Sequence, residues 1–224
     1  MENLNFIKNN KLLIVGHYGV GKTNISVNLA FKLKKTTPKK VTLIDLDIVN
    51  PFFRSYDNVS ELNKADISTI YPPYAGTNVD VPSISAEVQK VFTNDDYAIF
   101  DIGGDDSGSI VLNTYKPSLE ECGYDMFAVI NMYRPYISTP ETAAEMLNAI
   151  ELTSNLKITG IINNSNLGFE TNQKTVYNSI KYAQDTANLY GVPLVATTVF
   201  KEINCNFDDI DNILYIENMT KNYF

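Results

Sequence analysis

Short runs of hydrophobic residues recur along the chain, and most of them end at a glycine, an asparagine or an aspartate. Six runs stand out, at residues 12–15, 41–44, 97–100, 126–130, 158–162 and 192–199. Runs of this length that are rich in Ile, Val and Leu are typical of strands buried on both faces of a parallel sheet. We therefore expect each run to form one strand.

The segments between these runs carry the three- and four-residue spacing of amphipathic helices. A helix is predicted to begin near Lys22, with Ile25, Leu29 and Leu33 on one face. This helix follows the first predicted strand after a short glycine-rich turn, which is the order of a βα unit.

Two further helices have terminal signals in the sequence. Ser138 is expected to cap a helix that has Pro140 in its first turn and Glu141 as the partner in a capping box. A later helix is expected to run from about Thr171 and to stop at Gly191.

Strands that alternate with helices in this way predict the fold class. The order is typical of an α/β protein with three layers, in which a mostly parallel, twisted sheet has helices on both faces. The stretch 51–94 is the least regular part, and residues 72–77 are predicted to form a loop. The sequence contains neither a repeat nor a linker, so residues 1–224 are expected to form a single domain.

Composition and charge restrict the partners. The formal net charge is −8 and 44% of the residues are hydrophobic, as is typical of globular proteins. A chain this acidic lacks the positive field that attracts nucleic acids and anionic membranes, so neither is an expected partner. Residues 1–11 lack the apolar core of a signal peptide, and the two cysteines form no C-x-x-C pair. These features predict a cytoplasmic protein.

One glycine-rich segment carries specific chemistry. The sequence after the first predicted strand fits the pattern G-x-x-x-x-G-K-[ST], and an amphipathic helix follows it. In such a loop the backbone N–H groups turn toward phosphate oxygens, the lysine contacts the β- and γ-phosphates, and the hydroxyl binds Mg²⁺. We therefore predict a P-loop that binds a nucleotide with Mg²⁺ and consists of Gly16, His17, Tyr18, Gly19, Val20, Gly21, Lys22 and Thr23.

Acidic residues follow the next two predicted strands. Asp45 and Asp47 come after residues 41–44, and Asp101 comes after residues 97–100. Because parallel strands present ligand groups at their carboxyl ends, these carboxylates are expected opposite the P-loop. There they could hold Mg²⁺ through water and orient an attacking water. Aspartates also form turns and helix caps after strands, and that alternative stays open for Asp45 and Asp47.

Together, these motifs resemble those of the MinD/ParA-type P-loop ATPases, in the CobQ/CobB/MinD/ParA superfamily. The resemblance rests on G-H-Y-G-V-G-K-T at 16–23, D-L-D-I-V-N at 45–50 and D-I-G-G at 101–104, in that order. It spans the first half of the chain, and the alternation of strands and helices extends it to the end. The resemblance implies the fold of P-loop NTPases, ATP as the ligand and Mg²⁺ as the cofactor.

The resemblance also implies roles for individual residues. Lys22 and Thr23 match the family's phosphate-binding lysine and Mg²⁺ ligand. Asp47 matches the aspartate that positions the attacking water, Asp45 is its neighbour at the strand end, and Asp101 matches the switch aspartate near the metal. On this basis Lys22, Asp47 and Asp101 are the expected catalytic residues. The expected metal site consists of Thr23, Asp45 and Asp101.

The P-loop departs from the family pattern at its second and third positions. Family members have a signature lysine there, which can contact phosphates across an ATP-sandwiched dimer, and then a glycine. This chain has His17, its only histidine, and Tyr18. An unperturbed histidine is mostly neutral at neutral pH, although nearby phosphates would favour its protonation. His17 is thus either a weaker phosphate contact or a loop residue, and an ATP-dependent homodimer stays open for this chain.

The residues after the strand at 158–162 bear on the choice of base. A guanine site of the N-K-x-D kind uses a carboxylate to accept hydrogen bonds from the base, whereas this chain has Asn163-Asn164-Ser165-Asn166 without an aspartate. That difference favours adenine. By resemblance to the family asparagine that follows this strand, Asn163 or Asn164 is the expected base contact. A turn role for both is the alternative.

The sequence holds only two arginines, Arg54 and Arg134, and each follows a predicted strand. Both are expected at the ligand edge of the sheet, where a phosphate or a carboxylate would suit a guanidinium. An internal salt bridge is the alternative. Cys122 could pair with its copy across a twofold axis, as in metal-centre maturation ATPases, but a small buried residue is the simpler interpretation.

Three functions fit these observations. The first is a slow Mg-ATPase in which the loops after Asp47 and Asp101 form a conformational switch that acts on a protein partner. The second is an ATP-dependent ligase resembling dethiobiotin synthetase, although residues 36–40 lack the K-P-V-type motif found there. The third is a nucleotide-responsive binding module with little turnover. We expect the first.

Overall fold

A computed structural model describes residues 4–47, 59–70, 82–104, 106–203 and 205–219. In this part of the chain eight parallel strands form one sheet, in the order β3-β2-β4-β1-β5-β6-β7-β8. The sheet matches the predicted α/β class. Its strands are β1 (Lys11–Val15), β2 (Val41–Asp45), β3 (Ile67–Ile70), β4 (Tyr97–Asp101), β5 (Asp125–Ile130), β6 (Gly160–Asn163), β7 (Leu194–Phe200) and β8 (Ile213–Ile216).

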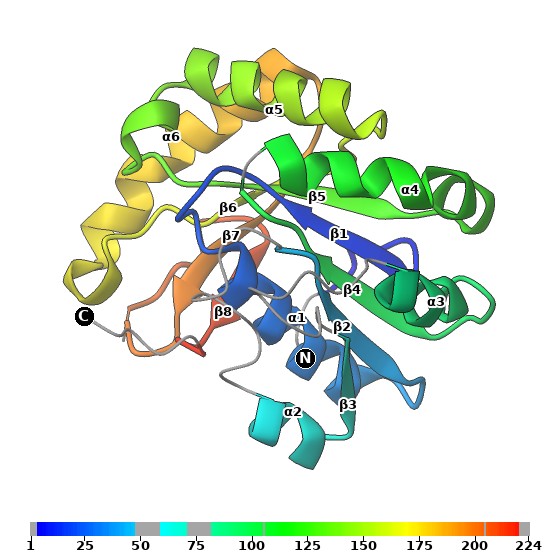
Figure 1. The fold of residues 1–224 in the computed structure, drawn as a ribbon. Helices are drawn as coiled ribbons and strands as arrows, with labels where there is room; N and C mark the ends of the chain where they lie inside the picture. The colour runs from blue at the N-terminus through cyan, green and yellow to red at the C-terminus, as the bar shows by residue number, and fades with distance from the viewer. Residues whose placement is uncertain (1–3, 48–58, 71–81, 105, 204, 220–224) are drawn as a thin grey trace.

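Helices cover both faces of the sheet and complete the three layers. Figure 1 shows α1 and α2 on one side of the sheet and α4 and α5 on the other, with α6 beside α5. Two short 3₁₀ helices, η2 and η3, follow β5 and β6. The helices are α1 (Lys22–Thr36), α2 (Val59–Lys64), α3 (Pro82–Val91), α4 (Asp106–Cys122), α5 (Pro140–Ser154), α6 (Gln173–Tyr190), η2 (Pro135–Ile137) and η3 (Gly168–Glu170).

The core lies where the predicted patterns placed it. All five residues of β1 are buried, and Ile25, Leu29 and Leu33 of α1 are buried on the face that packs against the sheet. Full burial of an aliphatic side chain of this size stabilises the fold by about 1.5–3 kcal/mol relative to exposure. The packing therefore fixes α1, and with it the loop before α1, against the centre of the sheet.

The strand register aligns the carboxyl ends of the central strands. Asp45 of β2 pairs with Asp101 of β4, and Ile14 of β1 pairs with the same Asp101. On the other side of β1, Ile130 of β5 pairs with Asn163 of β6. The residues predicted to be functional on different strands thus reach one edge of the sheet.

The start of α5 differs from the prediction. Thr139, rather than Ser138, is the N-cap, and its partner in the capping box is Thr142 rather than Glu141. The reason is Pro140, which is the first residue of the helix and restricts the residue before it to an extended conformation. An N-cap residue needs that conformation, so the cap moves to Thr139. The predicted end of α6 is confirmed, because Gly191 is its left-handed C-cap.

The stretch 51–94 is more regular than predicted, since it contains α2, β3 and α3. The predicted loop at 72–77 lies outside the described residues. Among the described residues, no helix is both long enough and apolar enough to cross a membrane.

Candidate functional site

The predicted P-loop connects the end of β1 to the start of α1. Gly21 is the N-cap of α1 in a left-handed conformation, with φ of 93°, which suits a glycine. The next residue, Lys22, is buried, and its ammonium group donates a 3.1 Å hydrogen bond to the main-chain oxygen of His17. The lysine thus lies over its own loop at the N-terminus of a helix, which is where an anion would bind.

A cavity of about 360 Å³ opens directly beside this loop. It extends from the P-loop across the carboxyl ends of β5, β6, β7 and β8, so distant segments of the chain complete it. Its lining consists of Tyr18, Gly19, Val20, Gly21, Lys22, Thr23, Asn24, Asp47, Arg134, Asn164, Asn166, Gly168, Phe200 and Asn218.

The predicted aspartates lie at the end of this cavity nearest the P-loop. Asp47 lines the cavity, and its backbone N–H donates a 2.9 Å hydrogen bond to Oδ1 of Asp45. Asp101 is buried behind them, where the hydroxyl of Ser26 lies 3.4 Å from its Oδ1. The structure therefore brings Asp101, at the end of β4, and the two aspartates at and just after the end of β2 to the P-loop end of the cavity.

Burial raises the pKa of the Asp101 carboxyl to about 6. The hydrogen bond from Thr23 and the positive charge of Lys22 oppose this rise, whereas the negative charge of Asp47 adds to it. All three side chains are therefore close enough to Asp101 to change its proton affinity. A cation bound between them would shift Asp101 toward its charged form.

The donor atoms at this end of the cavity fit a hydrated Mg²⁺. Among the described residues, nothing donates a hydrogen bond to Oδ2 of Asp101, although this oxygen is buried. Water on a metal ion would supply the missing donor, because Mg²⁺ usually keeps several of its waters. The residues that would hold the ion are Thr23, through its hydroxyl, and Asp45 and Asp101, through water. A bound ion would neutralise part of the phosphate charge.

The D-I-G-G segment after β4 lies against the P-loop. A Cβ atom added to Gly104 would lie 2.9 Å from Nζ of Lys22 and 2.9 Å from the backbone N and Cα of Tyr18. Real side chains do not approach backbone atoms so closely, so this position requires a glycine. The contact joins Lys22 to the segment that leads into α4.

The structure separates the two asparagines that were predicted as base contacts. Asn163 is fully buried, and its amide donates to the hydroxyl of Ser179 at 2.9 Å, away from the cavity. Asn164 lines the cavity, where its amide donates to the main-chain oxygen of Val20 at 2.7 Å. Its Oδ1 accepts a 2.6 Å hydrogen bond from Thr198. Asn164 is thus placed both to support the P-loop and to contact a ligand.

Helix α1 holds the segment after β8 in place. Oδ1 of Asn28 accepts from the backbone N of Glu217 at 2.9 Å, and its Nδ2 donates to the backbone oxygen of Glu217 at 2.8 Å. One turn earlier, Oδ1 of Asn24 accepts from the backbone N of Met219 at 2.7 Å. These three bonds fix the backbone on both sides of Asn218, a cavity-lining residue, so the P-loop helix also positions the far end of the cavity.

Sequence reasoning did not identify five residues of the lining as site residues: Asn24, Asn166, Gly168, Phe200 and Asn218. Phe200 ends β7 and Asn218 follows β8 by two residues. Both could have been found from the rule that parallel strands present ligand groups at their carboxyl ends, which identified Asp45 and Asp101. Asn166 and Gly168 follow β6 in the same way. The end of β7 was predicted one residue early, and β8 was not predicted.

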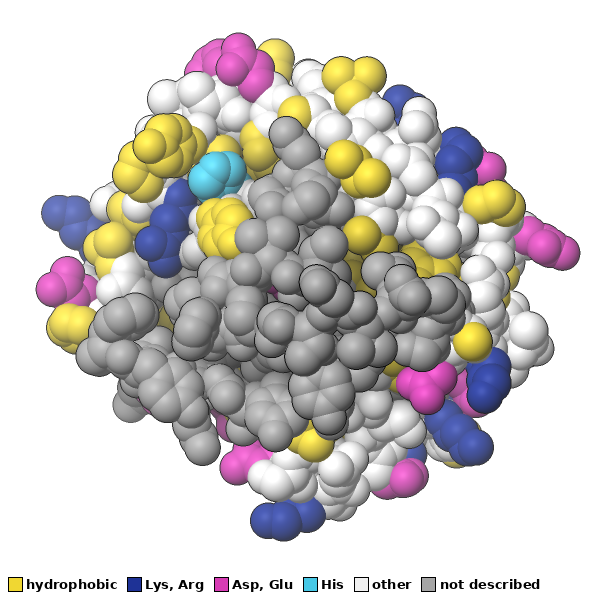
Figure 2. Space-filling view, in the orientation of Figure 1, with side chains coloured by type: hydrophobic (Ala, Val, Ile, Leu, Met, Phe, Trp, Pro, Cys, Tyr) yellow, Lys and Arg dark blue, Asp and Glu magenta, His cyan; other side chains and the backbone are white. Residues whose placement is uncertain are grey.

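His17 turns away from the cavity. Its ring centroid lies 5.7 Å from that of Tyr136, and the Tyr136 side chain is 77% exposed. Neither His17 nor Gly16 lines the cavity, whereas Tyr18 does. Figure 2 shows the histidine, in cyan, at the surface among hydrophobic side chains and beside Lys or Arg side chains. Arg134 lies at the cavity, as expected for the ligand edge, and Arg54 lies outside the described residues.

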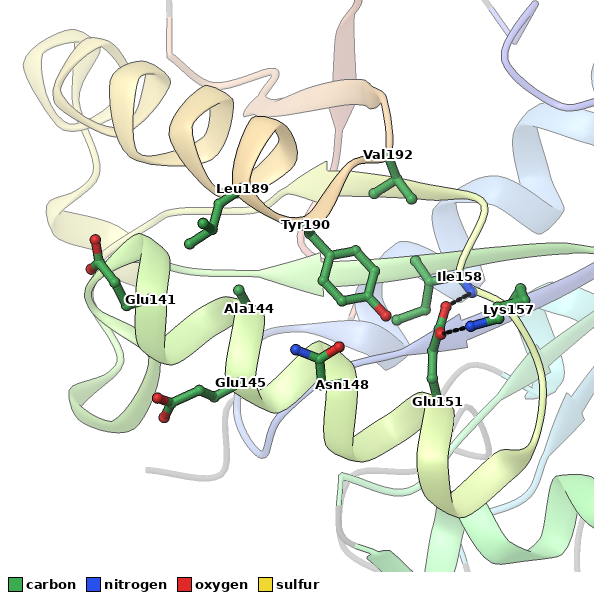
Figure 3. A pocket seen from close by; sticks show the side chains of 10 residues that line it. All are labelled: Glu141, Ala144, Glu145, Asn148, Glu151, Lys157, Ile158, Leu189, Tyr190 and Val192. Atoms are coloured by element: carbon green, nitrogen blue, oxygen red, sulfur yellow. Dashed lines mark hydrogen bonds and ion pairs between the residues drawn. The ribbon is translucent and has the colours of Figure 1, made fainter.

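A larger cavity, of about 610 Å³, lies between α5 and α6 and contains none of the predicted site residues. Figure 3 shows the Glu151 carboxylate there, which accepts hydrogen bonds from the ammonium group of Lys157 at 2.6 Å and from the backbone N–H of Ile158 at 2.8 Å. Although burial acts in the opposite direction, these bonds hold the pKa of Glu151 below its usual value. The side chain is thus engaged in joining α5 to the residues before β6.

Cys122 is exposed, so the prediction that it is a small buried residue was wrong. It ends α4, close to the start of β5 and so at the edge of the sheet opposite the P-loop. Burial raises the pKa of its thiol, which makes the metal-binding thiolate less available. In the part of the chain that the structure describes, no three His, Cys, Asp or Glu side chains converge on a metal site, so a Mg²⁺ beside the P-loop would depend on two carboxylates, the Thr23 hydroxyl and water.

Comparisons with known proteins support a P-loop NTPase. A family model described as ParA, NUBPL iron-transfer P-loop NTPase, matches residues 7–99, which include the P-loop and Asp45. The comparison with curated proteins gave no match.

Solved structures of FtsY share the fold. FtsY of Thermotoga maritima has a TM-score of 0.58 at 17% identity, over 86% of this chain and 62% of its own. FtsY of Mycoplasma mycoides has a TM-score of 0.56 at 16% identity, over 87% of this chain and 60% of its own. The signal recognition particle receptor FtsY of Elizabethkingia anophelis has a TM-score of 0.55 at 17% identity, over 92% of this chain and 62% of its own. This chain therefore spans about three fifths of these proteins, and it has the fold of a P-loop NTPase.

Proposed function

We propose that this protein binds Mg-ATP, hydrolyses it slowly and uses the cycle as a conformational switch on a protein partner. The single observation that carries the proposal is the cavity that joins the P-loop and Asp47 to the ends of β6, β7 and β8. One end offers backbone N–H groups, Lys22 and carboxylates for a Mg-triphosphate. The other end has room and polar groups for a base.

The lining at the far end supports adenine. Asn166 and Asn218 carry carboxamides, which can donate and accept at the same time, as the N6 and N7 edge of adenine requires. Phe200 offers an apolar contact for the base. Among the described lining residues Asp47 is the only carboxylate, and it lies at the P-loop end. GTP is the competing ligand, because one FtsY structure is a complex with GDP.

The contact between Gly104 and the P-loop supports the switch. Lys22 must contact phosphate when a nucleotide is bound, and in the structure its Nζ lies against the position of Gly104. A γ-phosphate at this place would change what the 101–104 segment contacts. The segment leads directly into α4, which packs against α5, so hydrolysis could be transmitted to the surface of the molecule.

Exposed hydrophobic side chains near the mouth of the cavity support a protein partner there. Tyr136 is 77% exposed and Phe169 is 96% exposed, and both belong to segments that contribute lining residues. Exposed hydrophobic surface beside a binding cavity is typical of interaction sites. A second copy of the chain and a different protein both suit this surface, and sedimentation with and without Mg-ATP distinguishes them.

The proposal is tested by nucleotide binding and turnover. Calorimetric titration should give a tighter dissociation constant for Mg-ATP than for Mg-GTP, and chelation of Mg²⁺ should weaken ATP binding. Phosphate release should be slow in the wild type and slower still in Asp47→Asn, which retains ATP binding. ATP binding without turnover in the wild type would favour a nucleotide-responsive binding module. Equal or tighter binding of GTP would contradict the choice of adenine.

A further inference from the structure

The second cation in the cavity is Arg134, and it lies over the P-loop. A Cβ atom added to Gly19 would lie 3.5 Å from Cζ of Arg134, 3.6 Å from its Nε and 3.8 Å from one terminal nitrogen. The guanidinium is therefore packed on the main chain of the loop at the position of Gly19. Both residues line the same cavity as Lys22 and Thr23.

The backbone before and after Arg134 is fixed. Its N–H donates to the main-chain oxygen of Asn131 at 3.0 Å, and its own oxygen accepts from Ile137 at 3.1 Å. Pro135 follows it and restricts Arg134 to the extended conformation that it adopts, with φ of −100° and ψ of 127°. Asn131 is buried, and its side chain accepts from the backbone N of Tyr133. The guanidinium thus starts from a rigid turn at the end of β5.

No acidic side chain among the described residues forms an ion pair with Arg134, and the residue is exposed. The internal salt bridge that was the alternative for this residue is therefore absent from the described part of the chain. An arginine aimed at a cavity from a rigid turn, without a carboxylate partner there, retains its hydrogen-bonding capacity for a ligand.

The balance of charge in the cavity indicates that Arg134 would bind an anionic ligand. A Mg-triphosphate carries more negative charge than Lys22 alone can neutralise, and Asp47 and Asp101 add to the negative side. The second position of the P-loop holds His17, which turns toward Tyr136 and does not line the cavity. The two described cations of the lining are Lys22 and Arg134, and a planar guanidinium can contact two phosphate oxygens at once.

From this arrangement we infer that Arg134 is a phosphate ligand of the bound nucleotide and supplies, from the end of β5, the second positive charge that the P-loop lacks. The inference rests on the proposed function, since it needs a nucleotide in this cavity. It assigns Arg134 to polyphosphate rather than to the base or to a partner protein.

The test compares Arg134→Gln and Arg134→Lys with the wild type, using two probes, Mg-ATP and inorganic tripolyphosphate with Mg²⁺. Lys174→Gln is the control, because Lys174 is an exposed lysine in the first turn of α6 that does not line the cavity. Arg134→Gln should weaken the binding of both probes by roughly tenfold to a hundredfold, as expected for a charge-assisted contact. Arg134→Lys should weaken them less, and Lys174→Gln should leave both affinities within about twofold of the wild type.

Each result has a definite meaning. Unchanged affinities in Arg134→Gln would overturn the inference and leave the proposed function intact. Weaker binding of ATP with unchanged binding of tripolyphosphate would also overturn it, because Arg134 would then contact the base or the ribose. A wild type that binds neither probe would instead refute the proposed function itself. Melting temperatures without ligand should be equal for all variants, as expected for substitutions of exposed side chains.

Discussion

The side-chain amide of Asn164 donates a 2.7 Å hydrogen bond to the main-chain oxygen of Val20 and so ties the end of β6 to the middle of the P-loop. The contact is close, because a Cβ atom added to Gly21 would lie 2.3 Å from Nδ2 of Asn164. The loop that would hold the phosphates and the strand end that would approach the base are therefore one hydrogen-bonded unit.

Replacing Asn164 with Ala should damage this unit. The buried oxygen of Val20 would lose its donor, which costs about 1–3 kcal/mol. For a chain of this size the melting temperature should fall by several degrees, and Mg-ATP should bind about tenfold more weakly because the loop is less rigid. Asn148→Ala is the control, since Asn148 is an exposed residue of the other cavity. Equal effects of the two substitutions would contradict the role given to Asn164.

Replacing Asn28 with Ala tests whether α1 positions the far end of the cavity. The change removes both hydrogen bonds to the backbone of Glu217, at about 1 kcal/mol each. Stability should fall, and Mg-ATP should bind more weakly while tripolyphosphate binds as before, because only the base end moves. The control is Asn178→Ala, an exposed asparagine of α6. If ATP and tripolyphosphate were affected alike, Asn28 would act on the P-loop rather than on Asn218.

The fold could be predicted from the sequence where strands are buried on both faces of the sheet. The strands at the centre of the sheet are covered on both faces, so they appear as hydrophobic runs, and all six predicted strands exist. β3 and β8 lie at the two edges of the sheet, and each combines buried residues with exposed or half-buried ones. Short segments of that kind resemble loops in sequence, and neither was predicted.

The candidate site could be predicted where its residues are close in sequence. The P-loop and the aspartates after β2 and β4 follow recognisable patterns, and the structure brings them together. Asn218 could not be found in this way, because its position depends on hydrogen bonds that its neighbours donate to the side chains of Asn24 and Asn28, almost two hundred residues away. For Asn163 and Asn164 the sequence offered no distinction, and the packing of Ser179 and Val20 separates them.

The pKa of Asp101 makes a prediction about stability without ligand. The folded chain holds the proton of this carboxyl up to about pH 6, whereas the ordinary value is 3.8. Between these two values the folded state binds more protons than the unfolded state, so stability from this group falls as the pH rises. Asp101→Asn should remove this loss. We expect the variant to melt several degrees above the wild type at neutral pH, and the two curves to converge near pH 4.

The difference in melting temperature between Asp101→Asn and the wild type is measured by thermal melting from about pH 4 to pH 8 in the presence of a chelator. Mg-ATP should narrow it, because Mg²⁺ favours the charged carboxylate that Asn cannot provide. A variant that melts below the wild type at neutral pH would contradict the assignment of Asp101 as a carboxyl whose charged form is disfavoured by burial.

The most direct measurement of the central claim is the melting temperature of the wild type and of Lys22→Ala, each alone, with Mg-ATP, with Mg-GTP and with ATP plus chelator. Lys35→Ala, an exposed lysine of the same helix, is the matched control. At a hundredfold excess over the dissociation constant, Mg-ATP should raise the melting temperature of the wild type and of Lys35→Ala by about 5–10 °C. Mg-GTP and ATP with chelator should raise it less, and Lys22→Ala should not respond. A wild type that Mg-ATP does not stabilise, or a Lys22→Ala variant stabilised as much as the wild type, would contradict the account.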